Sequence, residues 1–134
     1  MLTTHEALVY SMVITAAADH EMTDAELITM GEIVNWLPVF RGFDTSELAR
    51  ISGDCAKVLL EDDGFEKAIE LVHEALPERL RETAYALAVE VAAADLYADQ
   101  AELSVLQMLR YQLEIDRLIA AGIERGARAR FSVL

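Results

Sequence analysis

The chain has 134 residues, 54% of them hydrophobic, and its 24 acidic against 11 basic side chains give a net charge of −13. This length predicts one domain, and the negative charge argues against nucleic-acid binding because the phosphates would be repelled. A single cysteine excludes an internal disulfide and any zinc site with several cysteines, and it leads us to expect a cytoplasmic protein.

The first predicted helix runs from Thr3 or Thr4 to Ala18 and is apolar almost all round, so we expect it at the centre of the fold. Its uncharged stretch, residues 7–18, is twelve residues long. That is shorter than the roughly 20 residues needed to cross a bilayer, so we expect no direct membrane insertion.

The second predicted helix begins at Thr23, where Thr-Asp-Ala-Glu forms a capping box with Glu26, and it ends at Pro38. Trp36, near its end, is expected to close the bundle. Apolar residues at helical spacing predict further helices before and after residues 61–64, then over 77–94, 99–112 and from about 116, with 125–134 as a frayed tail. The chain is therefore expected to be an all-α, single-domain bundle of about seven helices spanning residues 1–134.

The chain also contains an internal repeat. Residues 12–37 and 88–113 share nine identities over 26 aligned positions. Each segment has an Asp at a helix end and a Glu after six intervening residues: Asp19 and Glu26 in the first, Asp95 and Glu102 in the second. We therefore expect a pseudo-two-fold bundle in which the two acidic corners lie near one another.

Helix capping accounts for the two glutamates, because each occupies the third position of a capped helix near the positive end of the helix dipole. It does not account for Asp19 and Asp95, each of which falls at a helix C-terminus, where an acid is disfavoured. Two interpretations stay open. Each Asp can form an Asx-type turn, or the acids can bind a hard divalent cation such as Ca²⁺, Mg²⁺ or Mn²⁺.

In the cation interpretation Asp19, Glu26, Asp95 and Glu102 are the ligands. Further carboxylates stand nearby and are possible additional ligands: Glu21, Asp24 and Asp99.

The duplicated "AAAD" helix end, the fixed distance to Glu and the middle segment "GFEKAIELVHEALPERLRE" resemble the TerB-like (tellurite resistance protein B) family. The resemblance implies a cytoplasmic stress-response module that binds a divalent cation at the two acidic corners. It also implies protein partners from a tellurite-resistance system, membrane-associated ones included. Many relatives have Gly after each Asp, whereas this chain has His20 and Leu96.

Other candidate sites are weaker. Glu70 and His73 match the Glu-x-x-His spacing of di-iron bundles, but that motif occurs once where two are needed. Glu90 interrupts an apolar run and is expected at an edge that reaches water, and Cys55 is expected to be an inert core residue. Late arginines, among them Arg117 and Arg128, form at most a small cationic patch.

No catalytic set can be assembled, so we expect a binding module and not an enzyme. The alternative to a cation-binding module is a metal-independent protein-interaction adaptor whose acidic corners are only helix caps.

Overall fold

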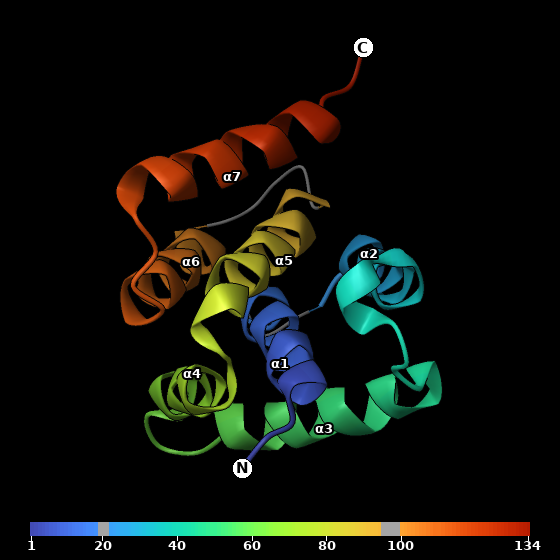
Figure 1. Ribbon diagram of the computed structural model, residues 1–134, viewed down its shortest axis with the longest axis vertical. Helices are drawn as coiled ribbons and strands as arrows, with labels where there is room; N and C mark the ends of the chain where they lie inside the picture. Colours follow the sequence, from blue (N-terminus) through green and yellow to red (C-terminus); the bar gives the residue numbers. More distant parts are fainter. Residues whose placement is uncertain (19–21, 95–99) are drawn as a thin grey trace.

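The computed structural model describes residues 1–18, 22–94 and 100–134, and Figure 1 shows how they are arranged. All regular structure in this part of the chain is helical, which confirms the predicted all-α bundle. In chain order the elements are α1 (Thr4–Ala16), α2 (Asp24–Trp36), η1 (Pro38–Phe40), η2 (Thr45–Glu47), α3 (Leu48–Leu59), α4 (Gly64–Ala75), η3 (Glu78–Leu80), α5 (Arg81–Ala94), α6 (Gln100–Gln112) and α7 (Arg117–Arg130).

Helix α1 lies at the centre of the bundle and contacts α3, α4 and α5 (Figure 1). Every residue from Ala7 to Ala16 is buried. Two of them are polar, and each hydroxyl donates a hydrogen bond one turn back, Ser11 to the Ala7 carbonyl at 3.0 Å and Thr15 to the Ser11 carbonyl at 3.2 Å. Because both hydroxyls are satisfied within the helix, α1 can be buried on all sides, as its sequence predicts.

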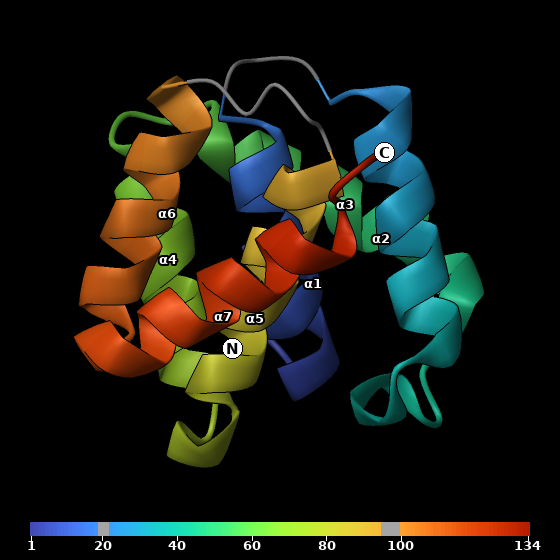
Figure 2. The same ribbon diagram turned by 90° about the horizontal axis from the view of Figure 1, so that it is seen from above.

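Helix α5 is the second central element, since it packs along α1 and is also contacted by α2, α6 and α7. In Figure 2, α2 and α6 lie on opposite sides of the α1–α5 pair, and α7 crosses over α5. The C-terminal ends of α1 and α5 and the N-terminal ends of α2 and α6 all lie toward one end of the molecule, the upper edge of Figure 2. The described residues that flank the two acidic corners therefore share this end.

Side-chain caps define several helix starts. Thr23 and Glu26 form the predicted capping box at the start of α2, and Thr3 and Glu6 form a second one at the start of α1. The carboxylate of Asp116 accepts hydrogen bonds from two backbone N–H groups in the first turn of α7, at 3.0 and 3.3 Å. The box predicted at Asp99 lies outside the described residues.

The fifth predicted helix begins later than expected. Pro77 has an extended backbone conformation, and the next three residues form the 3₁₀ turn η3, in which the Leu80 N–H bonds to the Pro77 carbonyl at 2.9 Å. The α-helix starts only at Arg81. Proline therefore precedes the turn instead of occupying the first position of the α-helix.

Trp36 does not close the bundle, because its side chain is 85% exposed. The buried stripe of α2 consists of Met30, Ile33 and Val34. At 100° per residue Trp36 lies well off the centre of that stripe and faces outward. We expected Trp36 to be buried because its side chain is large and apolar. Burial on a helix depends instead on the face that the residue occupies, so the expectation was wrong.

The expectation that residues 125–134 fray was also wrong for the part up to Arg130, which belongs to α7. Two contacts hold this end of the helix. Ala127 is buried against the core, and Arg130 forms an ion pair with Glu90 of α5. A tertiary contact between residues forty positions apart is not visible in the local sequence.

The two segments expected to form the repeat contain the end of α1 with α2, and the end of α5 with α6; the pseudo-two-fold relation between them stays a prediction. Of the helices that the structure describes, none has both the length and the apolar character needed to cross a bilayer.

Candidate functional site

Three of the seven acids predicted to bind a cation lie within the described residues. Glu26 and Asp24 are in the first turn of α2, and Glu102 is in the first turn of α6. The others, Asp19, Glu21, Asp95 and Asp99, lie outside the described residues, as do His20 and Leu96. The structure thus describes Glu26 and Asp24 of the first predicted corner and Glu102 of the second.

Glu26 is held in place by its own helix start. The Thr23 side chain accepts a hydrogen bond from the Glu26 N–H at 3.1 Å. In return, the Thr23 N–H and hydroxyl donate to Glu26 Oε1 at 2.9 and 3.0 Å. The residue is completely buried, with 0% of its surface exposed. Its second oxygen, Oε2, is also shielded from solvent and has no hydrogen-bond partner among the described residues.

Glu6 provides a comparison within the same chain, because its capping box has the same chemistry. The Thr3 N–H donates to Glu6 Oε1 at 2.8 Å, and the Glu6 N–H donates to the Thr3 hydroxyl at 3.1 Å. Here, however, the side chain is 21% exposed, and Oε2 accepts from Arg50 Nη2 at 3.3 Å. The Thr3 N–H, assisted by Arg50, holds the pKa of Glu6 below its ordinary value.

Capping therefore uses one carboxylate oxygen in both boxes. At Glu6 the second oxygen meets water and a guanidinium, whereas at Glu26 it is enclosed. Enclosing a carboxylate oxygen without a partner is unfavourable unless a cation or a proton compensates for it.

Glu102 repeats the position of Glu26 in the other half of the chain. It is the third residue of α6, and only 1% of its surface is exposed. Helices α2 and α6 begin at the same end of the molecule, on opposite sides of the α1–α5 pair (Figure 2). The sequence comparison of the two corners thus identified two buried glutamates in a strongly acidic chain, where most carboxylates are exposed.

Asp24 differs from these two residues. It is the first residue of α2, and its side chain is exposed. An exposed carboxylate at this position favours the positive end of the helix dipole without any ligand. Among the described residues there is no group of three or more His, Cys, Asp or Glu side chains arranged to hold a metal ion. The described part of a cation site therefore consists of the glutamates of α2 and α6.

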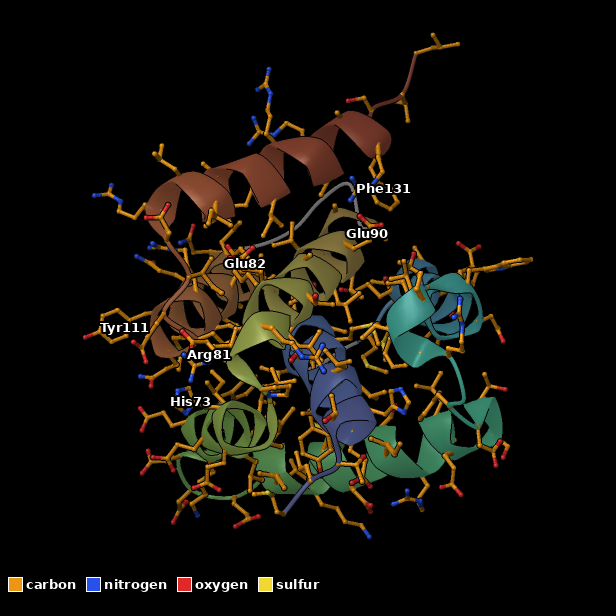
Figure 3. All side chains as sticks on the ribbon, viewed as in Figure 1. His73, Arg81, Glu82, Glu90, Tyr111 and Phe131 are labelled. Carbon is orange, nitrogen blue, oxygen red and sulfur yellow. The ribbon has the colours of Figure 1, made fainter. Side chains whose placement is uncertain are left out.

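The Glu-x-x-His pair on α4 has a different environment from a di-iron site. His73 Nε2 lies 3.2 Å from Arg81 Nη2, and the two side chains lie side by side in Figure 3. Glu114 Oε1 is 3.8 Å from the same histidine nitrogen and 3.9 Å from Arg81 Nη1. Because arginine only donates, Nε2 must accept from it, so the lone pair that would bind a metal is directed at a cation.

Glu90 and Cys55 have the structural roles expected of them. Glu90 is partly exposed at the edge of α5 and forms its ion pair with Arg130 (Figure 3). Cys55 is buried, and burial raises the pKa of its thiol to about 12. A thiol with so high a pKa carries almost no thiolate near neutral pH and is therefore a poor nucleophile.

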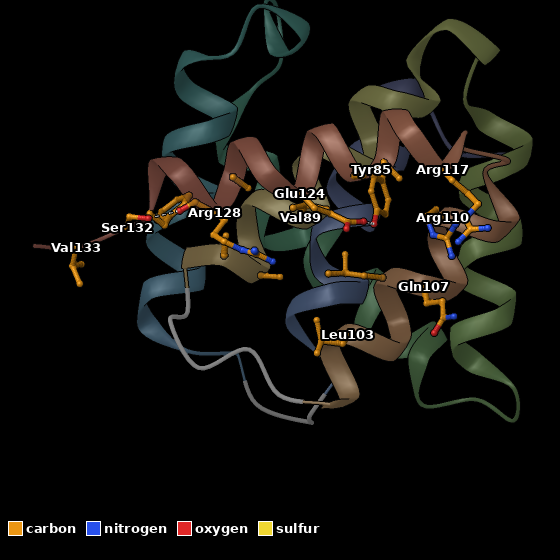
Figure 4. Close-up of a pocket in the computed structure, with 17 residues that line it drawn as sticks. Tyr85, Val89, Leu103, Gln107, Arg110, Arg117, Glu124, Arg128, Ser132 and Val133 are labelled. Atoms are coloured by element: carbon orange, nitrogen blue, oxygen red, sulfur yellow. Dashed lines mark hydrogen bonds between the residues drawn. The ribbon is translucent and has the colours of Figure 1, made fainter.

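A pocket of about 770 Å³ between α5, α6 and α7 was missed by sequence reasoning (Figure 4). Two of its lining residues are bonded to each other: the Tyr85 hydroxyl donates to Glu124 Oε2 at 2.5 Å. Burial and this carboxylate raise the pKa of Tyr85 above its ordinary value. The arginines noted late in the sequence were the available clue, since Arg117 and Arg128 both line the pocket.

Comparison with models of known protein families, with curated proteins and with solved structures finds no match for this chain. The resemblance to the TerB-like family thus rests on the two acidic corners and the middle segment of the sequence.

Proposed function

We propose that this protein is a non-enzymatic, cytoplasmic stress-response module of the TerB-like, tellurite-resistance type that binds a divalent cation at its two acidic corners. The ligands are Glu26 and Glu102, with Asp19 and Asp95 taken from the duplicated motif. Protein partners of the same stress system, membrane-associated ones included, would respond to the cation-bound form.

The observation that carries this proposal is the enclosed Oε2 of Glu26, which has no hydrogen-bond partner among the described residues. Removing a charged group from water costs several kcal/mol even after the surroundings relax. The Thr23 cap offsets part of that cost through Oε1 alone. The Thr3–Glu6 box caps α1 equally well with its carboxylate partly in water, so capping gives no reason for the deeper burial of Glu26.

The kind of cation follows from the ligand chemistry. Carboxylate oxygens are hard ligands and suit Ca²⁺, Mg²⁺ or Mn²⁺, whereas a structural zinc site favours thiolate and imidazole. The only cysteine is buried on α3, and Glu26 and Glu102 are at the starts of α2 and α6. A cation held by both corners would join the α1–α2 and α5–α6 connections and stabilise the folded state.

The second candidate function is a metal-independent protein-interaction adaptor, and the outer face of α2 favours it. Trp36 is 85% exposed, and Ile28 on the same helix is mostly exposed as well. Large apolar side chains on a surface are typical anchors for protein partners. In this alternative Glu26 is a cap and nothing more.

Thermal unfolding with chelator and with excess Ca²⁺, Mg²⁺ or Mn²⁺ separates the two functions. We expect at least one of these ions to raise the Tm of the wild type, because only the folded state forms the site. An ion at 100 times its Kd adds about 2.7 kcal/mol to the free energy of unfolding. Glu26→Gln keeps an acceptor for the Thr23 N–H but removes the charge, so the increase should disappear.

Glu6→Gln is the matched control, since it makes the same change in the Thr3 box and should leave the metal response intact. If no ion raises the wild-type Tm, or if the two variants respond alike, the cation-binding function is wrong. Under the adaptor alternative, Glu26→Ala lowers the free energy of unfolding by about 0.5–2 kcal/mol with or without metal.

A further inference from the structure

None of the described acids of the two corners, Glu26, Glu102 and Asp24, lines the pocket between α5, α6 and α7. Its volume of about 770 Å³ lies within the roughly 300–1,000 Å³ typical of small-molecule sites. Three turns of an α-helix 10 Å across would occupy about 1,300 Å³, so a helical segment of a partner is too large to be enclosed there. The volume thus favours a small molecule.

The walls of the pocket are largely apolar, and small side chains create the space. Ala92 and Ala93 of α5 and Ala120 and Ala127 of α7 are among its lining residues. Leu103 of α6 also lines the pocket and is half exposed, although it is a large apolar residue. An apolar ligand chain lying here would cover surface that is now in contact with water.

The charge of the pocket is opposite to that of the whole protein. Arg110, Arg117 and Arg128 line it, and none of them forms an ion pair with a described carboxylate. The one described carboxylate in the lining, Glu124, already accepts the Tyr85 hydroxyl. Three arginines and one glutamate give the lining a charge of +2 in a chain whose net charge is −13.

The arginines are not spread evenly around the pocket. Figure 4 shows Arg110 of α6 and Arg117 of α7 at the same end of the pocket, while Arg128 lies farther along α7. Two neighbouring guanidinium groups without a carboxylate between them repel one another, and an anion placed between them relieves that repulsion. Guanidinium groups match the geometry of carboxylate and phosphate with paired hydrogen bonds.

We propose that this pocket binds a single-chain anionic amphiphile. The apolar chain lies along the alanine-lined walls, and the anionic head group is held by Arg110 and Arg117. A fatty carboxylate and an alkyl phosphate share this chemistry. The site uses none of the described residues of the proposed cation site, so it can be tested independently of that site.

The direct test is calorimetric titration with three probes that share a ten-carbon chain: decanoate and decyl phosphate below their micelle concentrations, and decanol below its solubility limit. We expect one or both anions to bind, and decanol to bind at least tenfold more weakly because it lacks the charge. The tighter of the two anions identifies the head group as carboxylate or phosphate. Because each buried methylene strengthens binding up to about fourfold, octanoate should bind more weakly than decanoate.

The variant Arg110→Gln/Arg117→Gln should weaken binding of the anions at least tenfold, with Tm and circular dichroism confirming that it folds. Arg125→Gln is the matched control, because Arg125 lies on α7 but does not line the pocket, and it should bind as the wild type does. Equal binding of decanol and decanoate, or equal losses in both variants, would overturn the proposal. So would a dimer that the double variant dissociates while no amphiphile binds, since a second copy would then fill the pocket.

Discussion

Glu6 and Glu26 are chemically the same residue in the same capping box, yet their second oxygens have different environments. Oε2 of Glu6 is reached by Arg50, whereas Oε2 of Glu26 is enclosed without a partner among the described residues. The sequence pattern of a capping box specifies the bonds of one oxygen and nothing about the other. Glu26 is a candidate cation ligand because its Oε2 is buried, whereas that of Glu6 is not. This burial depends on how α2 packs against the rest of the bundle.

Cys55 allows a prediction at the same scale. Burial raises the pKa of its thiol to about 12, compared with about 8.5 in an unfolded chain. Above pH 8.5 the unfolded state therefore loses a proton that the native state keeps. As the pH rises toward 12, this residue lowers the free energy of unfolding by about 1.4 kcal/mol per pH unit.

Denaturant unfolding between pH 8 and 10.5 measures this effect, with Cys55→Val as the reference that lacks the thiol. The wild type should lose stability relative to the variant as the pH increases. Parallel pH profiles of the two proteins, or rapid reaction of the native thiol with a disulfide reagent at pH 8, would contradict the buried position.

At the scale of elements, local sequence patterns predicted the helices well where a helix has a long apolar sequence or a clear side-chain cap. The central position of α1 follows from its uninterrupted apolar sequence, and the starts of α2 and α7 follow from Thr23 and Asp116. The predictions that failed depend on tertiary packing. The exposure of Trp36 reflects which face of α2 meets the core, and the length of α7 reflects a contact with α5.

The end of α7 provides the prediction for this scale. Arg130 bonds to Glu90 on α5, and removing that pair should let the last turn of the helix open more often. In Arg130→Gln we expect faster hydrogen exchange at amides 127–131 and a small loss of global stability, about 0–1 kcal/mol as for other solvent-accessible pairs.

Arg128→Gln is the control for this experiment, since it removes a neighbouring charge of α7 that has no ion-pair partner among the described residues. Its exchange rates should match those of the wild type. If Arg130→Gln exchanges no faster than this control, the ion pair does not hold the end of α7.

At the scale of the whole molecule, the sequence predicted the fold class and identified Glu26 and Glu102 as the residues to examine, because both are repeated at the same position. It could not reveal that both would be buried, because burial depends on how helices distant in the sequence pack together. The pocket could not be predicted either, because its lining comes from three separate helices. Its arginines come from α6 and α7, and its alanines come from α5 and α7.

The whole molecule thus has two candidate sites of opposite charge. Glu26 and Glu102 place buried carboxylates at the end shared by the starts of α2 and α6. The pocket contains guanidinium groups of α6 and α7 that form no ion pair with a described carboxylate. A chain with a net charge of −13 attracts cations in general, so specific binding has to be distinguished from this background by its location.

An anomalous difference map from crystals grown with Mn²⁺ locates the ion directly. We predict a peak within bonding distance of Glu26 Oε2, with Glu102 as a further ligand from α6. A map with no peak at Glu26, in which Oε2 instead receives a hydrogen bond from a protein group, would contradict it.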